Sequence, residues 1–204
     1  FARREVEYVP GEDADLIERL PTEIHMDHAR TVIAHNRSPD IPFVQSINPY
    51  RGCEHGCIYC YARTTHAYLH LSPGRDFETQ LFYKPDAARL LRAELAKART
   101  VTPIALGTNT DPYQPIEKQY RIMREVLEVL EARNHPVGIV TKSALVMRDI
   151  DILSRMAERG LAKVALSVTT LDRMLARVMA PRASTPTKRL EAIRQLTDAG
   201  IPAS

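Results

Sequence analysis

The chain has 204 residues, of which 44% are hydrophobic and 26% charged, and its formal net charge is +3. This composition excludes a disordered tail, a collagen and a coiled coil, and the length suits one domain with a substantial core. No stretch reaches the roughly 20 uninterrupted apolar residues that span a bilayer, and no secretory signal is visible, so we expect a cytoplasmic protein without a membrane segment.

The first 42 residues differ in texture from the rest, and we expect an N-terminal extension over residues 1–42 and a core domain over residues 43–204. Short helices are expected at residues 13–20 and 27–35, followed by a loop at residues 38–42. The chain does not begin with Met, and its last residues have the pattern of a strand that is just starting. We therefore expect a core domain that is truncated at its C-terminal end.

Four short apolar runs are predicted to be strands, at residues 43–47, 103–107, 136–141 and 164–168. Continuous apolar runs of this kind suit strands that are buried on both faces of a sheet. Ile201 is expected to open a fifth strand.

Amphipathic segments separate the later strands. Apolar residues at helical spacing predict helices at residues 86–98, 118–134 and 148–159. A fourth helix is expected to start after Thr185, an N-cap residue, with Pro186 at its first position. This alternation of strand and helix is typical of a parallel sheet with right-handed crossovers.

The only cysteines are Cys53, Cys57 and Cys60, which form a CxxxCxxC pattern after the first strand of the core. An odd number of cysteines without a secretory signal argues against a disulfide framework and favours a thiophilic metal site. Two kinds of site fit: a structural zinc site with a fourth ligand, or a 4Fe-4S cluster with one iron left open. The zinc site could take its fourth ligand from one of three histidines: His55, His66 or His70.

A CxxxCxxC loop after the first strand of a βα array, with the aromatic Tyr59 before the last cysteine, resembles the radical S-adenosylmethionine (SAM) superfamily. Residues 46–63, 108–115 and 180–183 resemble the branch related to spore photoproduct lyase, often described as DNA-repair-photolyase-like. The resemblance implies an α/β fold, a partial TIM-like (βα)6 radical SAM barrel, here truncated after about four and a half strands. Ala180 departs from the pattern, because the branch has Glu before its Pro-Arg pair.

The resemblance implies that the three cysteines bind a 4Fe-4S cluster and that SAM binds its open iron. Reductive cleavage of SAM would then give a 5′-deoxyadenosyl radical that abstracts hydrogen from a substrate, which the sequence does not identify. An external electron donor of the flavodoxin or ferredoxin type is expected as a partner. Two alternatives stay open: lyase-like repair of a DNA photoproduct, with nucleic acid as the substrate, and a non-catalytic Cys3His zinc or nucleic-acid-binding module.

Functional residues of parallel barrels follow the C-terminal ends of the strands. Together with the resemblance, this rule gives five candidates for binding SAM: Tyr59, Thr110, Lys142, Ser167 and Arg182. Lys142 is expected to neutralise the SAM carboxylate and Tyr59 to contact adenine. Asp111 and Tyr113 are candidates for catalysis. Each candidate also has a structural interpretation, such as a turn for Asp111 and core packing for Tyr113.

Thr108 bears on the alternative of photoproduct repair. The resemblance implies that spore photoproduct lyase has a cysteine at the matching position, which gives hydrogen to the product radical. A hydroxyl holds its hydrogen far more tightly than a thiol, so Thr108 cannot take that role. Three explanations remain: a tyrosine such as Tyr113 donates the hydrogen, a cysteine lies in the missing C-terminal part, or the substrate differs. We expect a different substrate.

Overall fold

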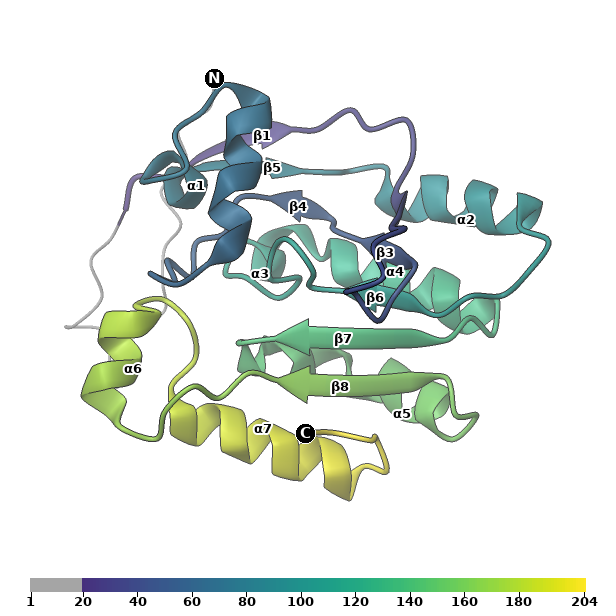
Figure 1. The fold of residues 1–204 in the computed structure, drawn as a ribbon. Coiled ribbons are helices and arrows are strands. Elements are labelled where there is room, and N and C mark those ends of the chain that lie inside the picture. The colour runs from purple at the N-terminus through teal and green to yellow at the C-terminus, as the bar shows by residue number, and fades with distance from the viewer. Residues whose placement is uncertain (1–19) are drawn as a thin grey trace.

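The computed structural model describes residues 20–204, so the helix expected at residues 13–20 lies outside the described residues except for Leu20. The larger of two sheets has the strand order β2-β3-β6-β7-β8 (Figure 1). Its members are β2 (Ile33–His35), β3 (Gln45–Ile47), β6 (Ile104–Leu106), β7 (Val137–Thr141) and β8 (Ala162–Leu166). The last four run parallel and β2 is antiparallel to β3, which confirms an α/β fold and the four expected core strands.

The fifth expected strand is present only as a single bridge. Val164 pairs with Ala203 in parallel, and Leu166 N donates to Ser204 O at 2.7 Å. The chain therefore runs beside β8, as expected from Ile201.

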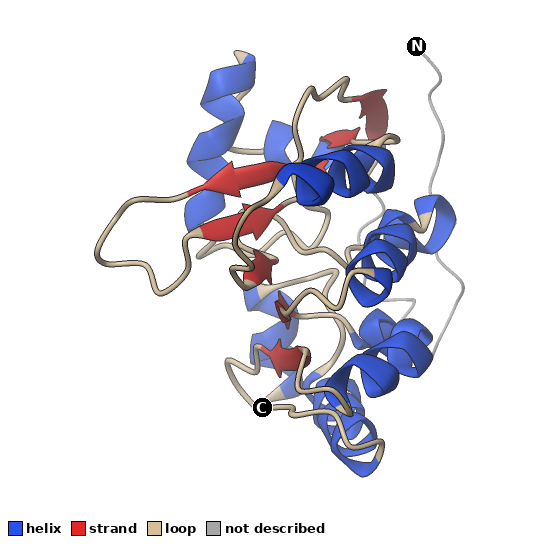
Figure 2. Cartoon of the chain, turned by 90° about the vertical axis from the view of Figure 1, so that its right-hand side faces the viewer, coloured by secondary structure: helices blue, strands red, loops and turns tan. Residues whose placement is uncertain are grey.

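Four longer helices follow the strands: α2 (Ala87–Lys97), α4 (Ile122–Ala132), α5 (Ile150–Ala157) and α7 (Pro186–Asp198). Most helices gather on one side of the strands (Figure 2). Successive side chains of a strand point to opposite faces of the sheet, which explains this arrangement. In β7, Val137 and Ile139 are buried in the core, whereas Val140 is exposed on the other face. Thr185 caps α7 by accepting from Lys188 N, as predicted.

The prediction of a helix at residues 27–35 is wrong. This segment instead follows β1 (Glu23–Met26) and ends in β2. The backbone N–H groups of Val32 and Ile33 donate to the Glu94 carboxylate of α2, at 2.7 and 3.2 Å. Backbone partners from distant residues therefore outweigh the local helical pattern.

A second sheet, with the order β1-β5-β4, was not anticipated. It contains β4 (Tyr50–Arg51) and β5 (Gln80–Tyr83), and β5 pairs parallel with β1 and antiparallel with β4. Five further helical segments complete the described fold: η2 (Tyr61–Leu69), α1 (Asp76–Thr79), α3 (Glu117–Tyr120), η3 (Ala144–Asp149) and α6 (Arg173–Met179). The helix expected at residues 148–159 is therefore divided: its first two residues belong to the 3-10 helix η3, and α5 follows.

The helix expected at residues 118–134 is divided at Arg121, whose φ of 52° is left-handed. α3 (Glu117–Tyr120) precedes this break and α4 follows it. The buried Glu117 carboxylate accepts from Met123 N at 3.1 Å and from Arg148 Nη2 at 2.6 Å. Glu117 therefore caps α4 and stabilises a break that the apolar pattern conceals.

Candidate cofactor site

The three cysteines line one small cavity of about 80 Å³, beyond the C-terminal ends of β6 and β7. The wall opposite the cysteines consists of residues 107–111 and 140–142. The fold thus brings the three cysteines into one lining with Thr110, Asp111 and Lys142, which lie at or beyond the C-terminal ends of β6 and β7. Tyr59 lies close by, since the Lys142 ammonium is 5.8 Å from the centroid of its ring.

Asp111 organises the wall opposite the cysteines. Its carboxylate accepts from the Thr141 hydroxyl at 2.6 Å and from Lys142 N at 2.7 Å. His55 Nδ1 lies 3.3 Å from the same carboxylate. Burial raises the pKa of Asp111, but His55, Thr141 and the Lys142 N–H outweigh burial and hold the pKa at about 2. Asp111 is therefore a carboxylate that positions Lys142.

The remaining candidates lie outside the lining of this cavity. Tyr113 is fully buried, and its hydroxyl donates to Asp149 at 3.1 Å, so it packs within the core. The Ser167 N–H donates to Thr141 O at 2.9 Å, and the Ser167 carbonyl accepts from Arg189 Nη1 at 2.6 Å. Ser167 meets the cavity wall only through this backbone hydrogen bond to Thr141, and the roles of Ser167 and Arg182 toward SAM stay predictions.

Arg182 belongs to a group that holds the cysteine loop in place, which we call the loop clamp: Arg63, Glu78 and Arg182. Arg182 donates through Nε to Glu54 O and through Nη2 to the Glu78 carboxylate. Arg63 donates to Cys57 O at 3.0 and 3.1 Å and to Glu78 at 2.5 Å. Glu78 therefore joins two guanidinium groups, each of which binds a carbonyl of the loop.

Gly56 shows how closely the clamp approaches the loop. A Cβ at this position would overlap Arg182 Nη2 and lie 2.7 Å from Glu78 Oε2, and its φ is +67°. Only glycine fits such a close approach in a left-handed conformation.

A second set of contacts holds the loop from the side of the residue 108–115 segment. Gln114 donates to Gly52 O at 3.1 Å and accepts from Glu54 N at 3.0 Å. The Glu54 carboxylate accepts from Ile116 N at 3.0 Å. Gln114 and Arg63 lie within the motif segments 108–115 and 46–63 but have no role that the sequence predicts, and no sequence pattern points to Glu78.

Two residues at positions of interest in the sequence have packing contacts in the structure. Ala180 is buried against Cys57, where the branch pattern has Glu. Thr108 is hydrogen-bonded to the Asn48 side chain at 2.9 Å, so its hydroxyl is engaged within the protein.

Three cysteines in the lining of one cavity are a donor set that fits an iron–sulfur cluster. Among residues 20–204, no group of three His, Cys, Asp or Glu side chains is arranged to hold one metal ion. His66, one expected zinc ligand, is instead hydrogen-bonded to Gln80 O at 2.9 Å. In a cluster each thiolate binds a different iron, so the sulfurs need not crowd one ion, and one shared cavity meets that requirement.

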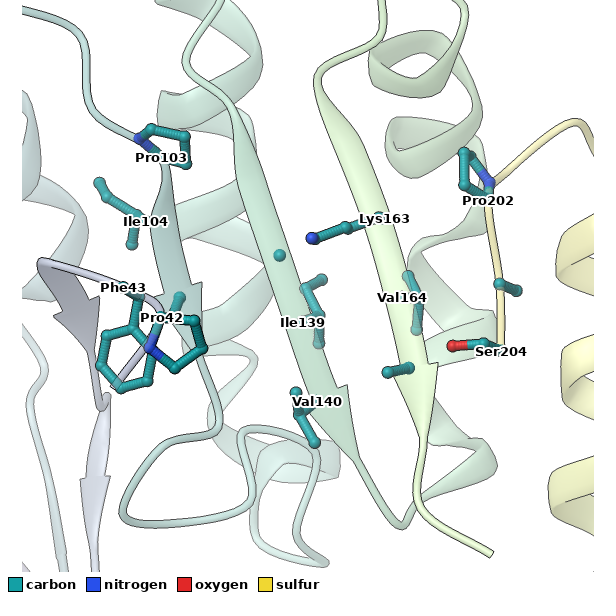
Figure 3. A pocket seen from close by; sticks show the side chains of 14 residues that line it. Pro42, Phe43, Pro103, Ile104, Ile139, Val140, Lys163, Val164, Pro202 and Ser204 are labelled. Atoms are coloured by element: carbon teal, nitrogen blue, oxygen red, sulfur yellow. The ribbon is translucent and has the colours of Figure 1, made fainter. Parts of the chain in front are cut away.

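A larger, mainly apolar cavity of about 580 Å³ lies against the face of β6, β7 and β8 that carries Val140, opposite the core. Small residues, Ala105, Gly138 and Ala165, leave this face open, and Val140 belongs to the lining of both cavities. Figure 3 shows the Lys163 side chain reaching across the cavity toward β7.

In the described part of the chain, no helix has the length and apolar character needed to cross a membrane.

Comparison with known families agrees with this geometry. Residues 47–204 match the family model described as the Radical SAM superfamily. The uncharacterized protein Rv2578c of Mycobacterium tuberculosis is 41% identical over 163 residues, which are 79% of this chain and 48% of that protein. The uncharacterized protein MJ0683 of Methanocaldococcus jannaschii is 27% identical over 179 residues, 88% of this chain and 64% of that protein. The chain thus spans about half to two thirds of the length of these relatives.

Solved structures of spore photoproduct lyase share the fold. A variant with a Cys→Ser substitution has a TM-score of 0.67 at 20% identity, covering 97% of this chain and 55% of the lyase. A second structure, complexed with dinucleoside spore photoproduct, has a TM-score of 0.64 at 19% identity, covering 88% and 49%. A third, with bound AdoMet and dinucleoside spore photoproduct, has a TM-score of 0.65 at 18% identity, with the same coverage.

Proposed function

Because this chain belongs to the radical SAM superfamily, we propose that it binds a 4Fe-4S cluster through Cys53, Cys57 and Cys60 and cleaves SAM reductively. The observation that supports this proposal most directly is the shared cavity, whose lining contains all three cysteines together with Thr110 and Lys142. When bound, the cluster and SAM would supply a 5′-deoxyadenosyl radical for hydrogen abstraction. The electron would come from an external donor of the flavodoxin or ferredoxin type.

The chain's own residues would bind and orient rather than exchange protons. Asp111 already accepts hydrogen bonds from Thr141 and the Lys142 N–H and lies 3.3 Å from His55 Nδ1, so it orients the end of β7 and does not serve as a free base. Lys142 lies at the cavity with a positive charge suited to the carboxylate of SAM. Tyr59 offers an exposed ring face beside Lys142 for adenine.

Anaerobic reconstitution tests the proposed function. A brown protein with iron and sulfide, whose spectrum changes on addition of SAM and which releases 5′-deoxyadenosine with dithionite, is the expected result. One zinc per chain without iron would instead favour the Cys3His alternative.

Replacement of Lys142 by alanine is expected to weaken SAM binding and to leave the iron content nearly intact, because thiolates alone hold the cluster. Loss of one charge-assisted contact predicts a Kd for SAM about tenfold higher. Titration of the reconstituted protein with SAM measures this change. Lys188→Ala on the exposed surface of α7 is the matched control and should bind SAM like the original protein. An unchanged Kd in Lys142→Ala would rule out the carboxylate role.

The substrate class is proposed to differ from that of spore photoproduct lyase. Residues 1–204 hold no thiol beyond the three assigned to the cluster, and the Thr108 hydroxyl is engaged with Asn48. The larger cavity, which shares Val140 with the thiol cavity, is the proposed space for a substrate.

Incubation of the reconstituted protein with spore photoproduct and SAM is accordingly expected to give no conversion to two thymines. Product analysis by chromatography measures the outcome, and release of 5′-deoxyadenosine in the same reaction is the control for an active cluster. Clean conversion at an enzymatic rate would contradict the prediction and restore photoproduct repair as the function.

A further inference from the structure

Arg189, in the first turn of α7, is a buried cation that has no acidic partner among the residues that the structure describes. Its side chain is among the largest that are fully buried, with 2% exposure. The guanidinium donates to two main-chain carbonyls, from Nε to Ser184 O at 2.7 Å and from Nη1 to Ser167 O at 2.6 Å. Within residues 20–204, no carboxylate lies within ion-pair distance of it.

The other two buried cations of the described chain have ion-pair partners. Arg182 pairs with Glu78, and Lys84 lies 3.3 Å from the Asp27 carboxylate. Burial of an unpaired charge costs several kcal/mol, even after relaxation of the surroundings. Arginine keeps its proton in proteins, so it cannot escape this cost by becoming neutral. Two carbonyl dipoles offset part of the cost, and a negative group close to Arg189 would offset the remainder.

The two carbonyls fix Arg189 behind the wall of the thiol cavity. Ser167, which follows β8, is hydrogen-bonded to Thr141, a residue of that wall. Ser184 follows Ala183, which packs against Cys57. Two separate connections therefore link the guanidinium to the cavity wall and to a residue that packs against Cys57.

Electrostatics agrees with this location. Burial and the Arg177 guanidinium lower the pKa of Arg189, whereas the Asp111 carboxylate, and Tyr59 and Cys57 when they are ionised, act in the opposite direction. Asp111 already has His55 beside it. A negatively charged group that could balance Arg189 would therefore have to lie in the thiol cavity.

We propose that Arg189 is a fixed cation that balances the negative charge of the cluster bound by Cys53, Cys57 and Cys60, and thereby favours its reduced form. The inference rests on the proposed function, because it requires a cluster at the three cysteines. A buried charge is poorly screened by water, so its effect on an added electron is larger than that of a surface charge. Net charge around a cluster is one of the properties that set its reduction potential.

The test is a redox titration of the reconstituted cluster without SAM, followed by electron paramagnetic resonance at pH 7. Arg189→Met removes the charge and keeps much of the side-chain volume. At a fixed poise, the ratio of reduced to oxidised cluster is expected to fall at least about tenfold, which for one electron is about 59 mV toward more negative potential. Arg189→Lys keeps a positive charge and is expected to stay close to the original protein.

Arg194→Met is the matched control. Arg194 lies on the same helix with 66% side-chain exposure, so its removal changes the net charge equally but at the surface. The potential of Arg194→Met should equal that of the original protein. An unchanged potential in Arg189→Met at full iron content, or an equal shift in Arg194→Met, would overturn the inference.

If Arg189→Met does not retain iron, the reduction potential of Arg189→Lys alone tests the proposal. A potential close to that of the original protein supports the role of charge, and a shift of the size expected for loss of the cation overturns it. Absence of any cluster in the original protein would contradict the proposed function instead, so the two failures are distinguishable.

Discussion

Replacement of any one of Cys53, Cys57 and Cys60 by alanine is expected to abolish iron retention and, with it, formation of 5′-deoxyadenosine. The three thiols line one cavity, and the sequence holds no other cysteine that could take the place of a lost ligand. Iron and sulfide per chain after anaerobic reconstitution and gel filtration measure the effect.

Thr108→Ala is the matched control, because Thr108 lines the same cavity without a proposed role in binding iron. This variant should keep its iron. A cysteine variant with full iron content would show that the corresponding thiol is not a ligand.

Glu78→Gln is expected to have the second largest effect, because it removes the negative member of the loop clamp. Glu78 joins Arg63 to Arg182, and the Arg182 side chain is only 4% exposed. Loss of one partner from a mostly buried ion pair predicts a decrease of about 3 kcal/mol in the free energy of unfolding. The cysteine loop would lose its support at the Glu54 and Cys57 carbonyls, so the iron content should fall as well.

Chemical denaturation and iron analysis of the same preparation measure both effects. Glu131→Gln is the matched control, since Glu131 also joins two arginines, Arg155 and Arg159, but these are 51% and 40% exposed. Surface pairs contribute roughly 0–1 kcal/mol, so this control should be close to the original protein in stability and equal to it in iron. Equal losses in the two variants would show that the clamp has no special role.

Much of the fold follows from the sequence because its signals are local. Continuous apolar runs bounded by Pro or Gly marked the four parallel strands, and the Thr185-Pro186 pair marked the start of α7. The three cysteines and the wall around Thr110 and Lys142 were predictable for the same reason, since thiophilic spacing and strand ends are visible in the chain itself.

The rest depends on partners that are distant in sequence. β2 exists where a helix was expected because Glu94 and β3 supply its hydrogen bonds. The break at Arg121 depends on the buried Glu117, whose partner Arg148 lies 31 residues away. Arg182 was expected at SAM from its motif, whereas its contacts to Glu78 and Glu54 could be known only from the fold.

The loop clamp has a consequence for the order in which the protein assembles. Arg182 is 128 residues from Glu54 and 104 residues from Glu78, so these contacts are among the most non-local in the chain. Closure of such long segments is entropically costly and occurs only when the intervening elements provide a scaffold. The cysteine loop therefore reaches its final shape late, after β6 to β8 have formed. During synthesis on the ribosome, the three thiols emerge long before Arg182 does, and metal insertion belongs at the end of this sequence of events.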